Sequence, residues 1–287
     1  TFATHMEIGK TQNLKVVRET ASGIFLKDKD GREALLPASH VKGDYKPGDT
    51  VKVFVYPDSD QKLLASLQIP VAEINQFVCL RVASVTDSGA FMAWGTEKDL
   101  FVPFAEQKFH LETDRNYVVF IYLDETSGRI VGSTRLEKFL NNDAMTIQGG
   151  DEVDILVYDE TPLGYSCVVN GKHSGLLYHN EVFQDIFAGE EFHAYVKKVR
   201  EDRLLDLSLQ KSGFKNVLDA SDKILDYLIH NNGFVGLHDK SSPEEIEQVF
   251  SMSKSTFKKS IGILYRHRKV LLKEDGVYLV KEENAGE

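Results

Sequence analysis

The chain contains 287 residues, of which 42% are hydrophobic and 27% are charged. This composition supports buried cores and excludes a disordered tail, and the length suggests two or more domains. No apolar run approaches the ~18 residues that a membrane-spanning helix needs, and the two cysteines cannot form a disulfide framework. We therefore expect a cytoplasmic protein with no membrane association, no metal site and no cofactor.

The formal net charge of −10 argues against a protein that holds nucleic acid by bulk charge alone. The charge is uneven along the chain, because acidic side chains outnumber basic ones in residues 71–212 and nearly balance them in residues 1–70 and 213–287. Local basic faces are therefore compatible with the acidic total.

Residues 1–210 consist of short β-branched or alternating runs separated by Gly, Asp and Pro, which is the pattern of strands and turns. The runs form three similar sets of five, and the sets are too long for the repeats of a solenoid but fit small closed barrels. The expected strands are 14–17, 22–26, 34–37, 51–55 and 63–67, then 78–82, 88–92, 100–103, 117–121 and 129–133, then 153–157, 163–168, 175–178, 192–196 and 204–209.

The second strand of each set carries a glycine near its start, at Gly23, Gly89 and Gly164. A glycine at this place lets a strand coil sharply enough to close a barrel. Five short strands with such a second strand are typical of the OB-fold, a small Greek-key barrel.

Three segments resemble the S-one-type RNA-binding repeat, which is an OB-fold. They are residues 88–91 (SGAF), 175–181 (GLLYHNE) and 203–209 (RLLDLSL). Single segments of this kind are weak evidence, but their order recurs in the three sets. We therefore expect S-one-type barrels over residues 1–70, 71–145 and 146–212.

From about residue 213 the apolar spacing becomes helical. A first helix is expected after a cap at Asp219 or Ser221, a second begins at Ser242 with proline in its first position, and Ser253 caps a third. Two wing strands follow at 270–272 and 277–280. This order of elements predicts an α/β winged-helix domain over residues 213–287.

Three S-one-type repeats followed by a winged helix resemble the conserved virulence factor B family of bacterial RNA-binding proteins. The most specific segments are residues 239–243, 250–254 and 257–262. The resemblance implies a cytoplasmic regulator that binds RNA and has no catalytic centre. The fold class that we expect is a mainly β, multidomain chain of three five-stranded barrels and a winged helix.

Single-stranded nucleic acid is bound by aromatic rings that stack on bases and by cations that hold phosphates. Strand alternation places Phe25 beside Lys27 and turns Phe91 away from the larger apolar set, so both rings are expected on the outer side, although partly buried packing is the alternative. In the third unit Ser166 replaces this phenylalanine. With the positions that match the repeat's pattern, the expected RNA-binding residues are Phe25, Lys27, Lys62, Phe91, Arg129, Tyr165, Tyr178, His179, Lys197, Lys198, Arg200 and Arg203.

The third helix of the winged-helix domain carries basic residues opposite its apolar stripe, in the position of a recognition helix. Duplex DNA or RNA is therefore a second possible partner of this domain. A solvated basic face and a protein-binding winged helix explain the same charges equally well. The basic residues are Lys254, Lys258, Lys259, Arg266, Arg268 and Lys269.

The sequence contains no HExxH, P-loop, GxSxG or GxGxxG motif, and we expect no catalytic residues. The expected function is a non-catalytic, RNA-binding, post-transcriptional regulator. Two alternatives stay open, a transcription regulator that reads duplex DNA through the winged helix and a protein-interaction scaffold.

Overall fold

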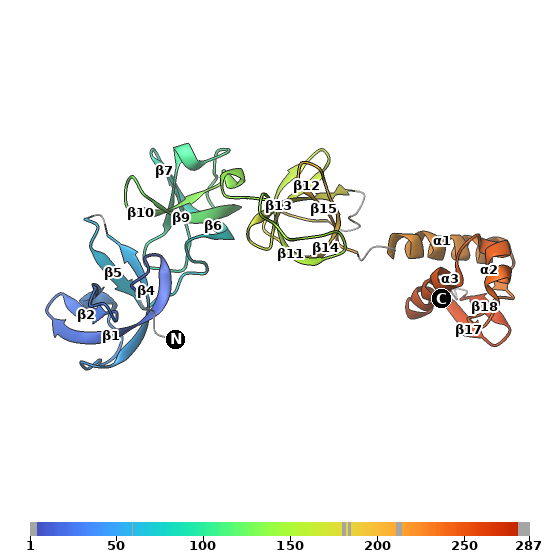
Figure 1. Cartoon of the computed structure of the whole chain (residues 1–287), viewed down its shortest axis with the longest axis horizontal. Helices are drawn as coiled ribbons and strands as arrows, with labels where there is room; N and C mark the ends of the chain where they lie inside the picture. Colours follow the sequence, from blue (N-terminus) through green and yellow to red (C-terminus); the bar gives the residue numbers. More distant parts are fainter. Residues whose placement is uncertain (1–4, 59, 180–181, 183–184, 211–213, 281–287) are drawn as a thin grey trace, which may run out of the picture. The chain divides into compact units, whose positions relative to one another are not determined.

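The computed structural model describes residues 5–58, 60–179, 182, 185–210 and 214–280, without the side chains of residues 214–219. The chain divides into two compact units, Thr1–Leu209 and Gln210–Glu287. Within the described residues, the first unit holds three closed five-stranded barrels, and the second holds three α-helices and a small sheet (Figure 1). The expected fold class is confirmed.

The barrels share one strand order, in which the third strand pairs with the fifth and the fourth closes against the first. Barrel 1 consists of β1 (Lys10–Thr20), β2 (Gly23–Lys27), β3 (Glu33–Pro37), β4 (Thr50–Pro57) and β5 (Leu63–Ser66). Barrel 2 consists of β6 (Gln76–Thr86), β7 (Gly89–Met92), β8 (Leu100–Pro103), β9 (Asn116–Asp124) and β10 (Arg129–Ser133). Barrel 3 consists of β11 (Glu152–Thr161), β12 (Gly164–Val169), β13 (His173–Tyr178), β14 (Glu191–Val199) and β15 (Leu205–Ser208). Every strand expected from the sequence overlaps one of these.

Glycine opens β2, β7 and β12 because the neighbouring strand runs too close for a side chain. A Cβ atom on Gly23 would lie 2.1 Å from the carbonyl oxygen of Leu36, and at Gly89 and Gly164 the nearest carbonyl oxygen would lie at 2.4 and 2.3 Å. Gly23 also has a φ of +134°, which L side chains rarely adopt. The repeated glycine is therefore a requirement of barrel closure.

The first strand of each barrel carries a β-bulge at the same place in its pairing with the second strand. The register shifts between Val16 and Arg18 in β1, and matching shifts follow Val82 in β6 and Val157 in β11. A bulge inserts one unpaired residue, so the residues beyond it point to the other side of the strand. Arg18 therefore lies outward, although a two-residue period from buried Val16 would place it in the core.

Barrels 1 and 2 share part of their hydrophobic core. Phe54, in β4 of barrel 1, is 1% exposed and packs among the core residues of barrel 2. Its ring meets the ring of Trp94 edge-on at a centroid distance of 5.3 Å, and the Trp94 indole nitrogen donates to the carbonyl of Ala72 at 2.7 Å. The two barrels are thus packed against each other through a buried aromatic contact.

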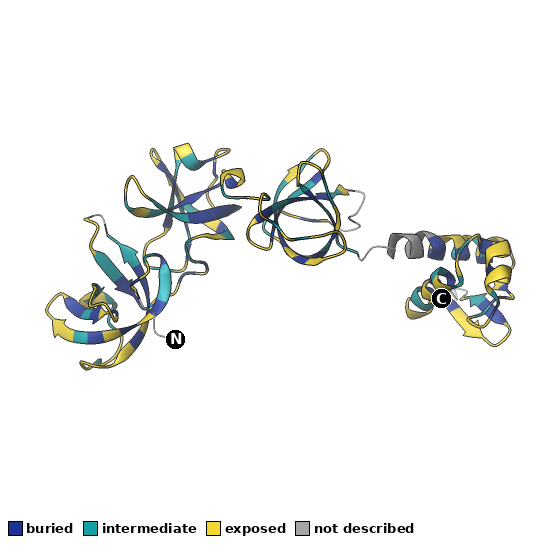
Figure 2. Ribbon diagram, viewed as in Figure 1, coloured by how far each residue is buried: buried dark blue, intermediate teal, exposed yellow. Residues whose placement is uncertain are grey.

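Barrels 2 and 3 meet at a separate hydrophobic cluster. Its buried members are Val118, Phe120, Leu136, Leu156 and Val168. Lys108 of barrel 2 adds ion pairs, with its Nζ 2.7 Å from Glu137 Oε1 and 3.1 Å from Asp159 Oδ2 of barrel 3. Buried residues, dark blue in Figure 2, therefore lie both inside the barrels and between them. The domain borders expected from the sequence stay predictions.

The second unit has the helix and strand order of a winged helix. Its elements are α1 (Phe214–His230), β16 (Phe234–Val235), α2 (Pro243–Phe250), α3 (Lys254–Arg266), β17 (Val270–Lys273) and β18 (Gly276–Leu279). Ser242 and Ser253 cap α2 and α3 as expected, through their side chains. None of the helices in the described residues is both long enough and apolar enough to cross a membrane.

Two details of this unit differ from expectation. The cap expected at Asp219 or Ser221 is wrong, because α1 already begins at Phe214 and both residues lie inside the helix. The helical backbone begins before the regular apolar spacing from which the helix was predicted. The sheet also has a third strand, since Phe234 and Val235 pair with β18. A strand of two residues is too short to show an alternating pattern.

Candidate nucleic-acid interface

Matching ladder positions in the three barrels define a row of side chains that lie outside the barrel core clusters, which we call the outer row. Two of its members, Val131 and Leu176, are themselves buried. The row has one member on each of the first, second, third and fifth strands of a barrel. Its member on the second strand lies two residues after the glycine that opens that strand. The outer row is Arg18, Phe25, Leu35 and Leu64 in barrel 1; Ser84, Phe91, Phe101 and Val131 in barrel 2; and Asp159, Ser166, Leu176 and Asp206 in barrel 3.

In barrel 1 the outer row is partly covered by one of its own members. The guanidinium carbon of Arg18 lies 4.0 Å from the centroid of the half-buried Phe25 ring. Glu33 holds this guanidinium in a two-pronged contact, with Nη1–Oε1 and Nη2–Oε2 distances of 2.6 and 2.8 Å. Their hydrogen bonding raises the pKa of Arg18 and lowers the pKa of Glu33, so the pair stays ionised at neutral pH. Arg18 therefore occupies one stacking face of Phe25.

The two lysines expected to bind RNA in barrel 1 are exposed. Lys27 lies opposite Glu33 in the ladder between β2 and β3. Lys62 precedes β5, and its Nζ is 4.0 Å from Asp60 Oδ2. Both ammonium groups face solvent beside a carboxylate, which reduces the positive potential that each one offers to a phosphate.

In barrel 2 the outer row contains an aromatic pair. The rings of Phe91 and Phe101 are half-buried, with centroids 5.0 Å apart and planes inclined at 39°. Ser84 occupies the position that Arg18 has in barrel 1, and a hydroxymethyl side chain is too short to cover a ring. Arg129, at the start of β10, is exposed and forms no salt bridge with any described residue. Barrel 2 thus combines accessible rings with a cation, the arrangement that single-stranded nucleic acid requires.

In barrel 3 the same row holds two aspartates, a serine and the buried Leu176. Ser166 stands at the position of the phenylalanines, between Asp159 of β11 and Leu176 of β13, and Asp206 of β15 follows Leu176. The carboxylate of Asp206 accepts a hydrogen bond from the hydroxyl of Tyr178 at 3.2 Å, and Asp159 pairs with Lys108 of barrel 2. The row itself carries no ring, although Tyr178 lies on the same side of β13 two residues beyond Leu176. Its two carboxylates face Lys108 and Lys198, and RNA binding by Tyr178 stays a prediction.

Tyr165 and His179 of barrel 3 are close to each other but not on its outer row. Tyr165 shares the register position of buried Ile24 in barrel 1, and it packs against the barrel 3 core. Its ring meets the His179 ring at 5.0 Å in a T-shaped contact, while His179 Nε2 lies 2.9 Å from the carbonyl oxygen of Thr161. The predicted role of both residues in RNA binding is untested by this geometry.

The basic residues of β14 and the turn after it are close to acidic or carbonyl oxygens. Lys198 is exposed and faces Asp206 across the ladder, and Lys197 is its exposed neighbour. Arg200 Nη2 lies 3.0 Å from Asp202 Oδ2. Arg203 donates to the carbonyl oxygen of Asp143 in the segment before β11. Much of this positive charge is therefore locally balanced, and RNA binding by this cluster stays a prediction.

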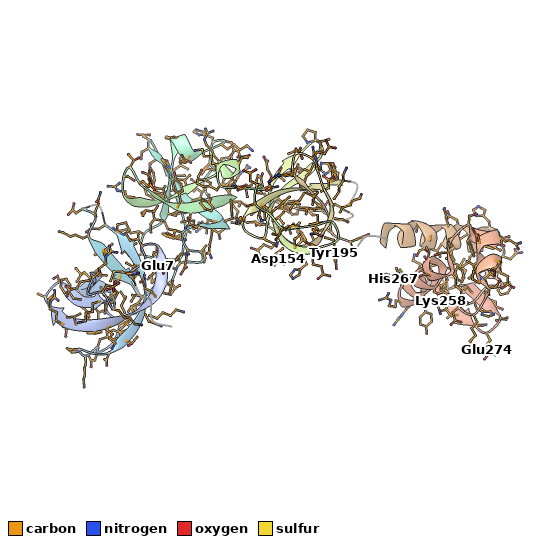
Figure 3. All side chains as sticks on the ribbon, in the orientation of Figure 1. Glu7, Asp154, Tyr195, Lys258, His267 and Glu274 are labelled. Carbon is orange, nitrogen blue, oxygen red and sulfur yellow. The ribbon has the colours of Figure 1, made fainter. Side chains whose placement is uncertain are left out.

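In the second unit, α3 buries one side and exposes a basic one. Phe257, Ile261 and Leu264 lie in the domain core. Lys254 is half-buried, and its Nζ lies 3.5 Å from the carbonyl oxygen of Lys240. Lys258, labelled in Figure 3, is exposed, and its Nζ lies 4.0 Å from Asp239 Oδ2. The remaining exposed basic residues of this region are Lys259, Arg266, Arg268 and Lys269.

Sequence reasoning missed Arg18 and Phe101. Arg18 follows a bulge, so a strict two-residue period puts it on the wrong side of β1. Phe101 could have been found, because buried Leu100 and Val102 on either side of it imply that its ring points outward.

Family comparisons agree with this architecture. An S1 domain model matches residues 8–68, and a CvfB-like winged helix domain model matches residues 222–279. Conserved virulence factor B of Staphylococcus epidermidis is 24% identical over 287 residues, which cover 96% of this chain and 95% of that protein. The chain is therefore similar, over nearly its whole length, to proteins named Conserved virulence factor B, and it carries the winged-helix domain that is described as CvfB-like.

Two further proteins also align with nearly the whole chain. Uncharacterized protein YitL of Bacillus subtilis is 26% identical, covering 95% of this chain and 94% of that protein. A crystal structure of a multidomain protein with nucleic acid binding domains from Streptococcus pneumoniae is 27% identical, with a TM-score of 0.39, and covers 95% of this chain and 98% of that one. The S1 and winged-helix domains that match this chain indicate nucleic-acid binding.

Proposed function

We propose that this protein binds single-stranded RNA through its barrels and acts in the cytoplasm as a post-transcriptional regulator of gene expression. The observation that carries the proposal is the Phe91–Phe101 pair on the outer row of barrel 2. Half-buried rings on a barrel face stack on unpaired bases, whereas the bases of a duplex are already stacked on each other. An exposed arginine beside the pair, Arg129, supplies the charge that attracts phosphates.

The differences between the outer rows support unequal contributions from the barrels. We expect barrel 2 to contribute most, because its rings are open. Barrel 1 contributes less, because a base must displace Arg18 or stack on top of it. Barrel 3 contributes least, because Ser166 replaces the stacking phenylalanine and the lysines that face Asp159 and Asp206 are balanced by these carboxylates. Several weak sites on one chain still give useful affinity, because the first contact raises the effective concentration of the others.

In the proposed function the protein binds RNA and catalyses no reaction. Both matched domain families are nucleic-acid-binding modules and not catalytic ones, which supports binding without chemistry. A regulator of this kind acts by occupying an RNA segment, and its effect depends on affinity and abundance alone.

A second candidate function is recognition of duplex DNA through α3. The observation that favours it is the exposed basic side of this helix, which carries Lys258 and Lys259 opposite the buried stripe. Helices in this position enter the major groove in helix-turn-helix proteins. If this function dominates, Lys258→Gln combined with Lys259→Gln abolishes binding and Phe91→Ala leaves it intact.

Fluorescence anisotropy of the full chain with labelled RNA, single-stranded DNA and duplex DNA tests the proposal. We expect a preference for RNA, and an affinity that falls with salt by a slope of about −0.7 for each phosphate held. A preference for the duplex assigns the main function to α3. No binding to any probe at low salt contradicts both and favours a protein-interaction scaffold.

A further inference from the structure

A groove between barrels 1 and 2 adjoins the outer row of barrel 2. Its volume is about 270 Å³, and its walls come from β4 of barrel 1 and from β8, β10 and the segment between β7 and β8 of barrel 2. The lining residues that matter below are Tyr56, Trp94, Lys98, Asp99, Phe101 and Arg129. Because Phe101 belongs both to the groove and to the outer row, the groove continues the candidate interface.

The groove is held open by the contact between the two barrels. The Tyr56 ring lies nearly parallel to the Phe54 ring, with centroids 6.0 Å apart and an interplanar angle of 16°. Phe54 is in turn fixed in the core of barrel 2. Across the same contact, Ser66 Oγ donates to Glu97 Oε2 at 2.8 Å. A ligand would therefore find the walls already in place, which lowers the entropic cost of binding.

The walls offer aromatic surface and neutral donors. Tyr56 and Phe101 are both half-buried, so each ring keeps an accessible part. Burial raises the pKa of Tyr56, and the nearby carboxylates of Glu97 and Asp58 raise it further. The phenol therefore stays protonated over the physiological pH range and can donate a hydrogen bond to a base or phosphate oxygen.

The groove is lined by two basic side chains, Lys98 and Arg129, and by two acidic ones, Asp58 and Asp99. Lys98 Nζ lies 5.9 Å from the Tyr56 ring centroid, and neither Lys98 nor Arg129 forms a salt bridge within the described part of the chain. Asp58 is occupied, since its Oδ1 accepts hydrogen bonds from the backbone nitrogens of Asp60 and Lys62 at 2.8 Å each. Asp99 is left as a carboxylate that can accept from the amino group of a base. A planar ring that carries a phosphate matches this set of groups.

We propose that this groove is a nucleotide subsite, in which one base of a single-stranded RNA moves the Lys98 ammonium from above the Tyr56 ring and stacks there, while an adjacent phosphate contacts Lys98 or Arg129. Its volume is just below the roughly 300–1,000 Å³ of small-molecule pockets, so it holds one nucleotide and no longer segment. The strand then continues to the Phe91–Phe101 pair. This subsite rests on the RNA binding proposed above and extends it across the two barrels.

Trp94 provides a direct test because it is the only tryptophan in the chain and lines the groove. The probe is a 12-nucleotide RNA of mixed sequence, used unlabelled for Trp94 emission and end-labelled for anisotropy. We expect the RNA to change Trp94 emission with the same midpoint that anisotropy gives. Phe91→Ala should weaken binding but keep the emission change at saturating RNA, because it leaves the groove intact.

Two variants of the full chain address the groove itself. Tyr56→Leu keeps an apolar side chain against Phe54 but removes the ring, and we expect roughly tenfold weaker binding and loss of the emission change. Lys98→Gln should weaken binding a few-fold and reduce its salt dependence. Lys52→Gln, an exposed lysine at the far end of β4, is the matched control and should behave as the unmodified chain. A thermal melt of each variant, followed by circular dichroism, identifies loss of the fold.

The outcomes separate the subsite from the function on which it rests. RNA binding with no change in Trp94 emission at saturation, and an unaltered affinity in folded Tyr56→Leu, overturns the subsite and leaves RNA binding in place. Absence of RNA binding in the unmodified chain overturns both. The subsite is supported if Trp94 emission changes with the midpoint that anisotropy gives, and if this change is lost in Tyr56→Leu and kept in Lys52→Gln.

Discussion

Barrels 2 and 3 have the same strand order, the same opening glycine and the same bulge, yet their outer rows have opposite chemistry. Barrel 2 presents Phe91 and Phe101, whereas barrel 3 has Ser166 at the position of Phe91 and two aspartates, Asp159 and Asp206, in the same row. The residues that close the barrel are therefore separate from those that face a ligand. A repeat can keep its fold and lose its binding surface through changes at a few outward positions.

If the two barrels have the same backbone geometry, the same glycine substitution should destabilise them equally. We expect Gly89→Ala and Gly164→Ala each to lower the free energy of unfolding by about 3 kcal/mol, the upper end of the range for strained backbone, because the new Cβ also meets a carbonyl oxygen. Chemical denaturation of each variant measures the loss. Unequal losses, with one variant close to the unmodified chain, would contradict the shared geometry.

Substitutions two residues further along should separate the barrels. Phe91→Ala removes a stacking ring and should weaken RNA binding by about 1–3 kcal/mol, which is roughly tenfold or more in Kd. Ser166→Ala, at the matching position of barrel 3, should leave Kd unchanged. Anisotropy with the same labelled RNA compares the two, and equal effects would mean that the outer rows do not set the affinity.

A smaller effect should identify the cation that accompanies the rings. Arg129→Gln should reduce the steepness of log affinity against log salt by about 0.7, the value for one phosphate contact on a single strand. The control is Lys172→Gln, which removes an exposed charge from barrel 3 and should leave the slope as it is. A parallel change in both variants would indicate a general charge effect and no contact at Arg129.

The smallest predicted effect concerns barrel 1, where Glu33 holds Arg18 over Phe25. Hydrogen bonding to Arg18 lowers the pKa of Glu33 from its usual 4.5. The pairing is therefore complete at neutral pH and is lost as the pH falls through this lowered value. A carboxyl titration by NMR should give a midpoint below 4.5 in the unmodified chain and a return toward 4.5 in Arg18→Gln. Identical midpoints would show that the contact does not persist in solution.

The sequence predicted the strands of the barrels well, because short alternating runs and turn residues directly encode them. Alternation also placed Phe25 and Phe91 on the side away from the core, although their role in binding stays a prediction. The bulges limited the reading of the first strands, since a local insertion reverses the two-residue period without any distinctive residue. The place of Phe54 in the core of barrel 2 could not be predicted from the sequence. An apolar residue of β4 has the same character whether it packs in the core of its own barrel or in that of the neighbouring one.

The position of Phe54 also makes the first two repeats inseparable in thermodynamic terms. A chain cut between them would expose an aromatic ring on one fragment and leave a void beside Trp94 in the other. Large-to-small changes at buried aromatics cost about 3–5 kcal/mol, a large share of the stability of a small domain. The repeated sequence unit is one barrel, whereas the unit that unfolds cooperatively contains two. Barrels 1 and 2 should therefore melt in a single transition.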